Sequence, residues 1–456
     1  ITGQKPIRRS KQGRFQIIDV VRMMEPITKR ASTIISGDRV ASMVREAVKL
    51  AEAERPGVVH LEFPEDIAAE EVTAVPIVPQ KIRRPGPDPK AITAAVEKLH
   101  QAKRPLIVIG AGANRKLVRK HLHAFIEKTG IPFLSTQMGK GVEDERSELY
   151  LGTTSLSAGD FMHRSFELAD LILMIGHDIT EKPPLVLEEK KRPAMIHINF
   201  YQADVDEVYV PELEVIGDIA HTLWAMGEEV ERQSGWDFRS FFVIRDALRA
   251  SIDTFATLPD FPVRPERVVH DLRAVLPPEG IVCLDNGMYK IWMARNYPAY
   301  EQNTVLLDNA LATMGAGLPA GIAAKMLFPE RPVVVLAGDG GLLMSIGDLE
   351  TAVRLGVHLV VLIVNDSGYG MIQWKQGEMK LPSFGLTFEN PDFVKLAESF
   401  GAHGHRVTAT DQLMPLLEQT LKQPGVHLID CPVDYRQNGP LLGEELRAAV
   451  KRINLP

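Results

Sequence analysis

Residues 332–374 read PVVVLAGDGGLLMSIGDLETAVRLGVHLVVLIVNDSGYGMIQW, and this stretch decides the fold. An apolar strand from Pro332 to Ala337 ends in Gly338-Asp339-Gly340-Gly341, and the pattern after it predicts a helix from Ser345 to Leu355. A second apolar strand, from His358 to Val364, ends in Asn365-Asp366. A strand, a crossover helix and a second strand form a parallel sheet, and ligands of such sheets bind beyond the carboxyl ends of the strands. A binding site is therefore expected where the two motifs meet.

The residues at the two strand ends predict a site for a diphosphate and a divalent cation. Glycines let the backbone approach a bulky anion, and amides near a helix start can bind phosphate oxygens. A carboxylate repels a diphosphate unless a cation lies between them, and Mg²⁺ prefers oxygen ligands from carboxylates and phosphates. Asp366, at the end of the neighbouring strand, would join Asp339 in such a site. Each motif alone is equally a tight turn of an α/β protein, whereas their conjunction at this spacing favours the site.

Length and composition indicate a soluble protein of several domains. The chain has 456 residues, of which 45% are hydrophobic and 24% charged, with a formal net charge of -7. This length exceeds one typical core, so two or three domains are expected. Without a basic excess or an apolar run of about 18 residues, neither nucleic-acid binding nor a membrane span is predicted. The two cysteines, Cys283 and Cys431, lie in apolar runs, and the expected compartment is the reducing cytoplasm.

Short β-branched runs alternate with helical patterns, which predicts an α/β fold of three doubly wound parallel-sheet domains. The runs include GVVHLEF, PLIVIG, LILMIG, AMIHINF, IVCLDN and HLIDCPV. Proline-rich, charged stretches near residues 81–90 and 257–266 separate the domains. The predicted segments are an incomplete first domain with its linker over 1–83, a central Rossmann-like domain over 84–225, a linker over 226–261, and a diphosphate- and metal-binding domain with the C-terminal tail over 262–456.

The paired motifs also carry a family resemblance. GDG followed after one helix and one strand by N-[ND] is the thiamine-diphosphate fingerprint, and the stretch LAGDGGLLMSIGDLETAVRLGVHLVVLIVNDSGYGMIQWKQ resembles acetolactate synthases. The resemblance implies pyrimidine-binding, central and diphosphate-binding domains, with thiamine diphosphate and Mg²⁺ as cofactors. It assigns the metal to Asp339, Asp366 and the carbonyl of Gly368. The further cofactor contacts that it implies are Gly338, Gly340, Gly341 and Tyr369, with Asn365 as support for the loop.

Two upstream segments resemble the cofactor-binding loops of the family. In LDNALATMGAGLPAGIAAK, residues 307–325, Met314 matches the bulky residue that holds thiamine diphosphate in a V shape. The carbonyl of Ala312 would accept a hydrogen bond from the 4′-amino group of the cofactor. Without that motif, Met314 would be interpreted as a core methionine. Residues 285–290, DNGMYK, match the loop that reaches the diphosphate, which implies contacts from Asn286, Gly287 and Met288. The role of Lys290 stays open, because catabolic relatives often carry His there.

The activating glutamate of the family is expected outside this chain. In the family, a glutamate of the pyrimidine-binding domain hydrogen-bonds N1′ of the cofactor, and residues 1–75 resemble only the later half of that domain. Glu46, Glu52 and Glu54 belong to an amphipathic helix and are expected on its solvated face. The first strands and helices would precede Ile1, so a truncated or incompletely represented enzyme is expected. A polypeptide that truly begins at Ile1 would be a nearly inactive, non-catalytic cofactor-binding fragment.

The central segment argues against a dinucleotide cofactor such as NAD or FAD. RPLIVIGAGANRK has G-A-G-A after a strand, but Arg115 stands where the third glycine of a dinucleotide motif would be. Biosynthetic acetohydroxyacid synthases bind FAD through an arginine-containing motif after the LILMIG-type strand, and residues 176–190, GHDITEKPPLVLEEK, lack it. No FAD is expected, as in the catabolic, FAD-independent acetolactate synthases, whose VDYR-type ending resembles residues 433–436.

Substrate contacts are predicted in two places. Phe15 and Gln16 match a family segment near the substrate pocket, although packing within a loop explains them equally. The other predicted contacts are Ile372, Trp374 and Lys375. Gln373-Trp374 resembles the QW of the biosynthetic enzymes, which would favour 2-oxobutyrate as acceptor, but the missing FAD motif outweighs this single tryptophan.

The resemblance implies an enzyme that decarboxylates pyruvate and joins the resulting two-carbon unit to a second 2-oxo acid, giving 2-acetolactate and CO₂. Glyoxylate carboligases and 2-oxo acid decarboxylases share the cofactor site and stay as alternatives. The partners implied are pyruvate and further copies of the chain in a homodimer or homotetramer, because the cofactor of this family lies between domains of two subunits.

Overall fold

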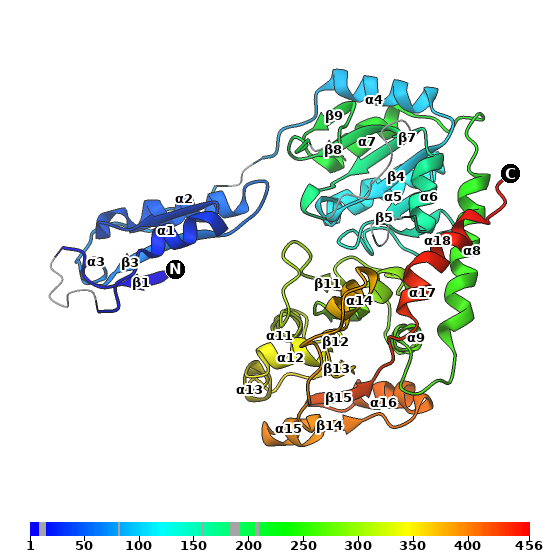
Figure 1. The fold of residues 1–456 in the computed structure, drawn as a ribbon. Helices are drawn as coiled ribbons and strands as arrows, with labels where there is room; N and C mark the ends of the chain where they lie inside the picture. The colour runs from blue at the N-terminus through cyan, green and yellow to red at the C-terminus, as the bar shows by residue number, and fades with distance from the viewer. Residues whose placement is uncertain (9–14, 81–82, 155, 157–158, 182–191, 206–208) are drawn as a thin grey trace. The chain divides into compact units, whose positions relative to one another are not determined.

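The computed structural model describes residues 1–8, 15–80, 83–154, 156, 159–181, 192–205 and 209–456 (Figure 1). Packing divides this chain into two units, Ile1–Pro85 and Gly86–Pro456. None of the helices in the described ranges is both long and apolar enough to cross a membrane.

The first unit is a small parallel sheet with a thin core. Its strands β1 (Thr2–Gln4), β2 (Arg30–Thr33) and β3 (Val59–Pro64) pair in the order β1-β3-β2. Its helices are α1 (Val20–Met24), α2 (Val40–Glu52) and α3 (Glu65–Ala68). The amphipathic helix expected near residue 46 is α2, and Glu46 on it pairs with Arg30 at 2.6 Å with both side chains about half exposed or more. The buried core consists of Ile34, Ala47, Leu61 and Ile67.

The second unit begins with a six-stranded parallel sheet of order β6-β5-β4-β7-β8-β9. The strands are β4 (Pro105–Ile109), β5 (Phe133–Ser135), β6 (Tyr150–Thr153), β7 (Leu171–Ile175), β8 (Ala194–Asn199) and β9 (Leu213–Ile216). The helices are α4 (Pro89–Gln101), α5 (Lys116–Thr129), α6 (Phe161–Leu168), α7 (Ile219–Glu229) and α8 (Arg239–Ala256). Helix α7 packs against both α4 and α5, and α8 packs against α6 and β6.

A second six-stranded parallel sheet follows, in the order β11-β10-β12-β13-β15-β14. The strands are β10 (Ile281–Leu284), β11 (Val305–Leu307), β12 (Val333–Gly338), β13 (Leu359–Asn365), β14 (His403–Arg406) and β15 (Val426–Pro432). The helices are α9 (Pro265–Val275), α10 (Tyr289–Asn296), α11 (Gly317–Leu327), α12 (Asp339–Ser345), α13 (Asp348–Arg354), α14 (Gly370–Glu378), α15 (Phe393–Ser399), α16 (Leu413–Thr420), α17 (Asn438–Leu442) and α18 (Glu444–Lys451).

The continuous apolar runs of this sheet supply two cores at once. Successive side chains of a strand point to opposite faces. Val334 and Leu336 of β12 pack into the core that includes α9, α10 and α16, whereas Val333 and Val335 pack into the core that includes α11, α13 and α15. Strands buried on both faces need apolar residues at every position. The predicted α/β fold of parallel sheets is therefore confirmed.

The helix predicted from Ser345 to Leu355 was placed wrongly at its start. The structure has two short helices, α12 and α13, and the first begins at Asp339 directly after β12. Gly340 and Gly341 thus lie in a helical turn, where glycine is normally unfavourable. A Cβ atom at Gly340 would lie 2.9 Å from the Tyr369 ring, and one at Gly341 would lie 2.4 Å from the Asp285 carboxylate. Close packing, rather than turn geometry, requires these glycines.

A buried ion pair joins the two large sheets of the second unit. The Lys140 ammonium lies 2.8 Å from Oε2 of Glu145, and both side chains are almost fully buried. Lys140 also donates to the carbonyl of Ala294, at the C-terminal end of α10, at 3.3 Å. Glu145 accepts a hydrogen bond from the backbone amide of Ala299 at 2.8 Å. Lys140 and Glu145 therefore each hydrogen-bond to the backbone at or just after the end of α10, and they connect this helix to the central sheet.

Removal of one member of this pair should be far more harmful than removal of an exposed ion pair. Lys140→Met leaves the Glu145 charge buried without compensation, and we expect it to lower the free energy of unfolding by about 3–5 kcal/mol. Urea unfolding of the wild type and the variant measures the difference. Arg354→Met is the control, because the Arg354–Glu350 pair is exposed and should contribute less than about 1 kcal/mol. Equal losses in the two variants would contradict this role of Lys140.

Candidate functional site

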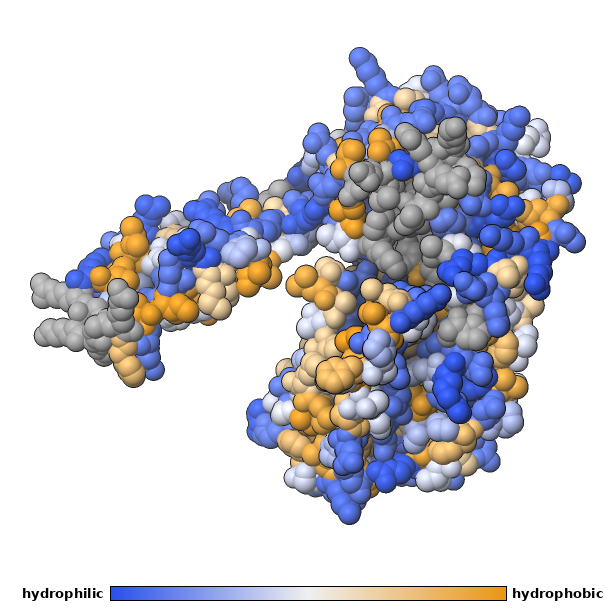
Figure 2. All heavy atoms as spheres, in the orientation of Figure 1, coloured by the Kyte–Doolittle hydropathy of each residue, from blue (hydrophilic) through white to orange (hydrophobic). Residues whose placement is uncertain are grey.

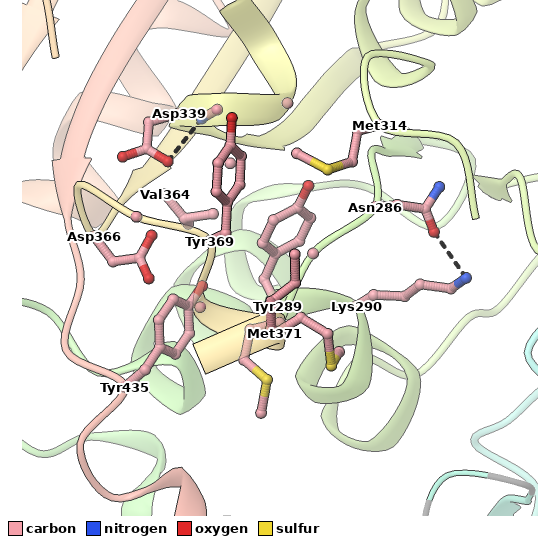
Figure 3. Close-up of a pocket in the computed structure, with 18 of the residues that line it drawn as sticks. Asn286, Tyr289, Lys290, Met314, Asp339, Val364, Asp366, Tyr369, Met371 and Tyr435 are labelled. Atoms are coloured by element: carbon pink, nitrogen blue, oxygen red, sulfur yellow. Dashed lines mark hydrogen bonds between the residues drawn. The ribbon is translucent and has the colours of Figure 1, made fainter. Parts of the chain in front are cut away.

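The carboxyl ends of β10, β12 and β13 surround a cavity of about 260 Å³ (Figure 3). Strand order reverses here, since β11 follows β10 on one side of the sheet and β12 lies on the other. Such a reversal opens a crevice in which ligands of α/β sheets bind. The cavity is lined by Asn286, Gly287, Met288, Tyr289, Lys290, Ala312, Met314, Gly338, Asp339, Gly340, Gly341, Val364, Asp366, Gly368, Tyr369, Gly370, Met371, Ile372 and Tyr435. All residues predicted to contact the cofactor or the metal are therefore gathered around one cavity.

Strand register brings the two acidic residues together. Gly338 pairs with Val364, so Asp339 and Asp366 leave the sheet at neighbouring strand ends and lie on the same side of the cavity (Figure 3). Burial raises the pKa of Asp339. Burial, with the charge of Asp339 as a second cause, raises the pKa of Asp366 to about 7. Two neighbouring buried carboxylates favour a proton or a cation between them.

A side-chain amide that sequence reasoning missed holds one of these acids, Asp339, in place. Nδ2 of Asn390 donates to Oδ2 of Asp339 at 2.7 Å and to Oδ1 of Asn365 at 3.0 Å. Asn365 in turn donates to Asp430 of β15 at 2.9 Å. The backbone amide of Ser367 also donates to Oδ2 of Asp339, at 2.8 Å. Asn390 precedes α15, far along the chain, and no local pattern connects it with the strand ends.

The opposite side of the cavity is formed by the loop after β11. Ala312 has a φ of +50°, which is unfavourable for a residue with a side chain and indicates that its surroundings hold it there. Asn286 donates to the carbonyls of Asp308 and Thr313, at 3.1 and 2.8 Å. The half-buried Met314 follows in the same loop and lies across the cavity from the two acids (Figure 3). The loop therefore places Ala312, with its unusual backbone conformation, and the apolar side chain of Met314 at the same wall of the cavity.

Two further neighbours of this loop have structural contacts of their own. The Asp285 carboxylate accepts the backbone amide of Gly315 at 2.8 Å, which fixes the end of the loop. The Lys290 ammonium donates to Oδ1 of Asn286 at 3.0 Å and to Oδ1 of Asn309 at 2.8 Å. Lys290, at the start of α10, therefore stabilises the loop through these two hydrogen bonds.

Two tyrosine hydroxyls in the cavity wall are buried and have no hydrogen-bond partner within the described part of the chain. They belong to Tyr289 and Tyr435. Burial is the main reason that the pKa of each hydroxyl lies well above its usual value, so both are neutral donors at physiological pH. Buried polar groups normally have a partner, and an orphan at a cavity marks a place where a ligand or water completes the contact. These hydroxyls suit a ligand with acceptor oxygens.

The residues predicted to contact substrate have different surroundings. Ile372 lines the cavity and is half exposed. Trp374, two residues on, faces a neighbouring hollow beside Tyr435, and the Lys375 ammonium lies over the Trp374 ring at 4.2 Å and pairs with Glu378. Phe15 and Gln16 belong to the first unit, where Phe15 is largely exposed and Gln16 has a φ of +56°. Of the predicted set, Ile372 is the one among the described residues that lines the cavity.

The glycines of the central segment have a packing role. Cβ atoms at Gly110 and Gly112 would lie 2.7 and 2.9 Å from the carbonyl oxygen of Gly176, so the loops after β4 and β7 press directly on each other. This contact accounts for the G-A-G-A pattern. Residues 182–190 of the segment examined for an FAD motif lie outside the described residues.

The residue set fits a cation held together with an anionic ligand. No cluster of three or more His, Cys, Asp or Glu side chains that could hold a metal occurs within the described ranges. A cation at Asp339 and Asp366 would thus need further oxygens from backbone carbonyls and from the ligand, which is how Mg²⁺ is bound with phosphates. The glycine-lined backbone at residues 338–341 leaves room for that ligand to approach.

Comparisons with known proteins match both large sheets. A family model described as "Thiamine pyrophosphate enzyme, C-terminal TPP binding domain" matches residues 285–431, and one described as "Thiamine pyrophosphate enzyme, central domain" matches residues 92–226. The chain is similar to the acetolactate synthase of Bacillus subtilis (strain 168), with 31% identity over 439 residues covering 94% of this chain and 76% of that protein. It is 30% identical to the catabolic acetolactate synthase of Raoultella terrigena over 434 residues, covering 94% and 78%.

The raised pKa of Asp366 predicts a pH-dependent stability. Between the usual pKa of 3.8 and the folded value of about 7, the folded state holds a proton that the unfolded state has lost. Stability therefore falls as pH rises through this window, and the penalty is complete above about pH 7. The variant Asp366→Asn cannot ionise at this position and so avoids the penalty. With a chelator present and without cofactor, the stability advantage of the variant over the wild type should therefore grow by about 2–3 kcal/mol from pH 5 to pH 8.

Urea unfolding at the two pH values measures this change. Asp348→Asn, an exposed acid at the start of α13, is the control and should show no such growth. An advantage of Asp366→Asn that is the same at both pH values would show that Asp366 is not strained by burial and by Asp339.

Proposed function

This chain belongs to the acetolactate synthase family of thiamine pyrophosphate enzymes, and on that premise we propose that it converts pyruvate and a second 2-oxo acid into 2-acetolactate and CO₂. Pyruvate is the proposed donor and also the proposed acceptor. The names of the relatives support this choice, since two similar proteins are an acetolactate synthase and a catabolic acetolactate synthase.

The observation that carries the proposal is the acidic pair beside the glycine-lined backbone. Asp339 and Asp366 would hold Mg²⁺, with the carbonyl of Gly368 as a further ligand, and the diphosphate of the cofactor would supply the remaining oxygens. Gly338, Gly340 and Gly341 would leave space for the diphosphate. The orphan hydroxyls of Tyr289 and Tyr435 offer donors close by.

Thiamine diphosphate supplies the carbanion stabilisation that decarboxylation and carbon–carbon bond formation require. The chain's own residues would bind and orient it. Met314 would support the cofactor from the loop side, and the carbonyl of Ala312, held by the +50° backbone, would accept a hydrogen bond from its amino group. Asn286, Gly287 and Met288 would complete the wall on the side of α10. We propose that no FAD takes part.

Exposed apolar side chains next to the cavity support an assembly of at least two copies. Leu311 and Phe384 are more than four-fifths exposed, and Met344 and Ile372 are about half exposed. Figure 2 shows apolar side chains gathered on this part of the second unit, around α11, α12 and α14. Apolar patches rimmed by polar residues commonly mark interfaces. We propose that the partner copy covers this patch in a homodimer or homotetramer.

The assay that tests the proposal uses the full-length gene product with pyruvate, thiamine diphosphate and Mg²⁺, and with FAD withheld. We expect acetolactate to form, and Asp339→Asn to lower the rate by at least about a hundredfold, because the cation would anchor and orient the diphosphate of the cofactor. The exposed acid variant Asp348→Asn should retain wild-type activity. Acetaldehyde as the main product would indicate a decarboxylase instead, and a requirement for FAD would contradict the cofactor proposal.

Asn390 should affect the metal more than the fold. Its amide orients Asp339 and Asn365, and loss of such a supporting hydrogen bond typically weakens metal affinity about 10- to 100-fold. We expect Asn390→Ala to raise the Mg²⁺ concentration for half-maximal activity by at least about tenfold, with activity largely recovered at saturating Mg²⁺. An unchanged Mg²⁺ requirement would mean that Asn390 has no part in metal binding.

A further inference from the structure

Asp430 is a buried acid in β15, the strand next to β13. It lies between Ile429 and Cys431, which are both fully buried, and its own side chain is only 4% exposed. Acidic side chains are rarely buried to this extent unless their oxygens have partners. Nδ2 of Asn365 donates to Oδ1 of Asp430 at 2.9 Å, and Nε of Arg406 donates to Oδ2 at 3.0 Å. Asp430 therefore joins the end of β13, at the candidate site, to the edge strand β14.

Strand register places these three side chains on one face of the sheet. Arg406 is the register partner of Asp430, and so is Ile363, which lies two residues before Asn365. Register partners of neighbouring strands, and residues two apart in one strand, share a face of the sheet. This face packs against α15, and Arg406 also donates to Asp392, the N-cap of that helix, at 3.0 Å. The hydrogen bonds thus form one row from β14 to the end of β13.

The Asp430 carboxylate determines which way the Asn365 amide faces. A carboxylate that is paired with an arginine only accepts hydrogen bonds, so the NH₂ group of Asn365 must face it. Oδ1 of Asn365 points the other way, where it accepts from Nδ2 of Asn390 at 3.0 Å and from the Ser367 amide at 3.2 Å. These two donors also bind Oδ2 of Asp339, at 2.7 and 2.8 Å. The orientation of Asn365 is therefore linked to the contacts that hold Asp339.

A reversed Asn365 amide would disturb these contacts. Its NH₂ group would face the NH₂ group of Asn390 and the Ser367 amide, and donors that face one another are left unsatisfied. A rotation of Asn390 that relieves this contact takes its NH₂ group away from Asp339. Oδ1 of Asn390 is buried and has no hydrogen-bond partner among the described residues, so the orientation of this amide depends on the acceptors around Nδ2. Loss of the Asn365 acceptor would therefore loosen Asp339.

We propose that Asp430 is a positioning residue of the cofactor site. With Arg406 on its other side, it holds the Asn365 amide in one orientation, and Asn365 in turn holds the Asn390 amide on Asp339. Asp430 is not among the residues that line the cavity, so it acts through its neighbours rather than by contact with a ligand. The inference rests on the proposed Mg²⁺ and thiamine diphosphate site. Such supporting hydrogen bonds typically change metal affinity about 10- to 100-fold.

Asp430→Asn tests the proposal, because it keeps the shape of the side chain and replaces one acceptor by a donor. Arg406 attracts the remaining oxygen, so the NH₂ group of the variant faces Asn365 and favours its reversal. Calorimetric titration of thiamine diphosphate into the full-length protein, at a series of Mg²⁺ concentrations, gives the Mg²⁺ concentration for half-maximal cofactor binding without any turnover. We expect Asp430→Asn to raise this concentration at least about tenfold.

A second substitution separates positioning from packing. When Arg406→Met is combined with Asp430→Asn, no guanidinium competes for the remaining oxygen, which is free to turn toward Asn365 and restore its orientation. Measured against Arg406→Met alone, the Asp430→Asn change should therefore raise the Mg²⁺ concentration less than about threefold. An acid that served only packing predicts the opposite, because the double variant has lost more contacts than either single variant.

Glu350→Gln is the matched control, since Glu350 is an exposed acid paired with Arg354 and should change the Mg²⁺ requirement less than about twofold. Asn365→Ala covers the case in which Asp430→Asn does not fold, because it removes the link and should raise the requirement at least about tenfold. An unchanged requirement in either variant, or an equal effect of Asp430→Asn with and without Arg406, would overturn the proposal. A wild type that binds no thiamine diphosphate in Mg²⁺ would refute the proposed cofactor site itself, which distinguishes the two failures.

Discussion

The rest of the candidate site depends on the proximity of two acids, the buried Asp339 and the partly buried Asp366. A parallel sheet forces them together, because β12 and β13 are neighbours and end at the same level. Burial, and after it the like charge of Asp339, raises the pKa of Asp366 to about 7. The fold therefore maintains an arrangement that is unfavourable by itself and becomes favourable when a cation joins it.

Surrounding groups keep this arrangement from relaxing. Asn390 and the Ser367 amide both donate to Asp339, and Asn365 is held between Asn390 and Asp430. Glycine at 340 and 341 allows Tyr369 and Asp285 to pack directly against the first turn of α12. These contacts come from four separate strand or helix ends, so the geometry of the acids is a property of the whole sheet rather than of one loop.

Helix α10 connects this site with the rest of the second unit. Its first turn lies in the wall of the site, and its last turn is bound by Lys140 from the central sheet. The same last turn carries Arg295, whose buried guanidinium lies 3.9 Å from the Asp160 carboxylate. A single short helix thus touches both the proposed cofactor site and the buried Lys140–Glu145 pair, and a change at either acts on the same backbone.

The sequence by itself determined the parallel α/β fold and the meeting of the two motifs, because apolar runs of strand length and the strand-end position of Asp339 and Asp366 are local properties of the chain. It also identified the glycines and the loop of Ala312 and Met314, through their resemblance to a known family. The tertiary structure alone decided the start of α12, the separate directions of Ile372 and Trp374, and the contact of Asn390 with Asp339. Each of these depends on packing or hydrogen bonds between residues far apart in the chain, and sequence spacing carries no record of such contacts.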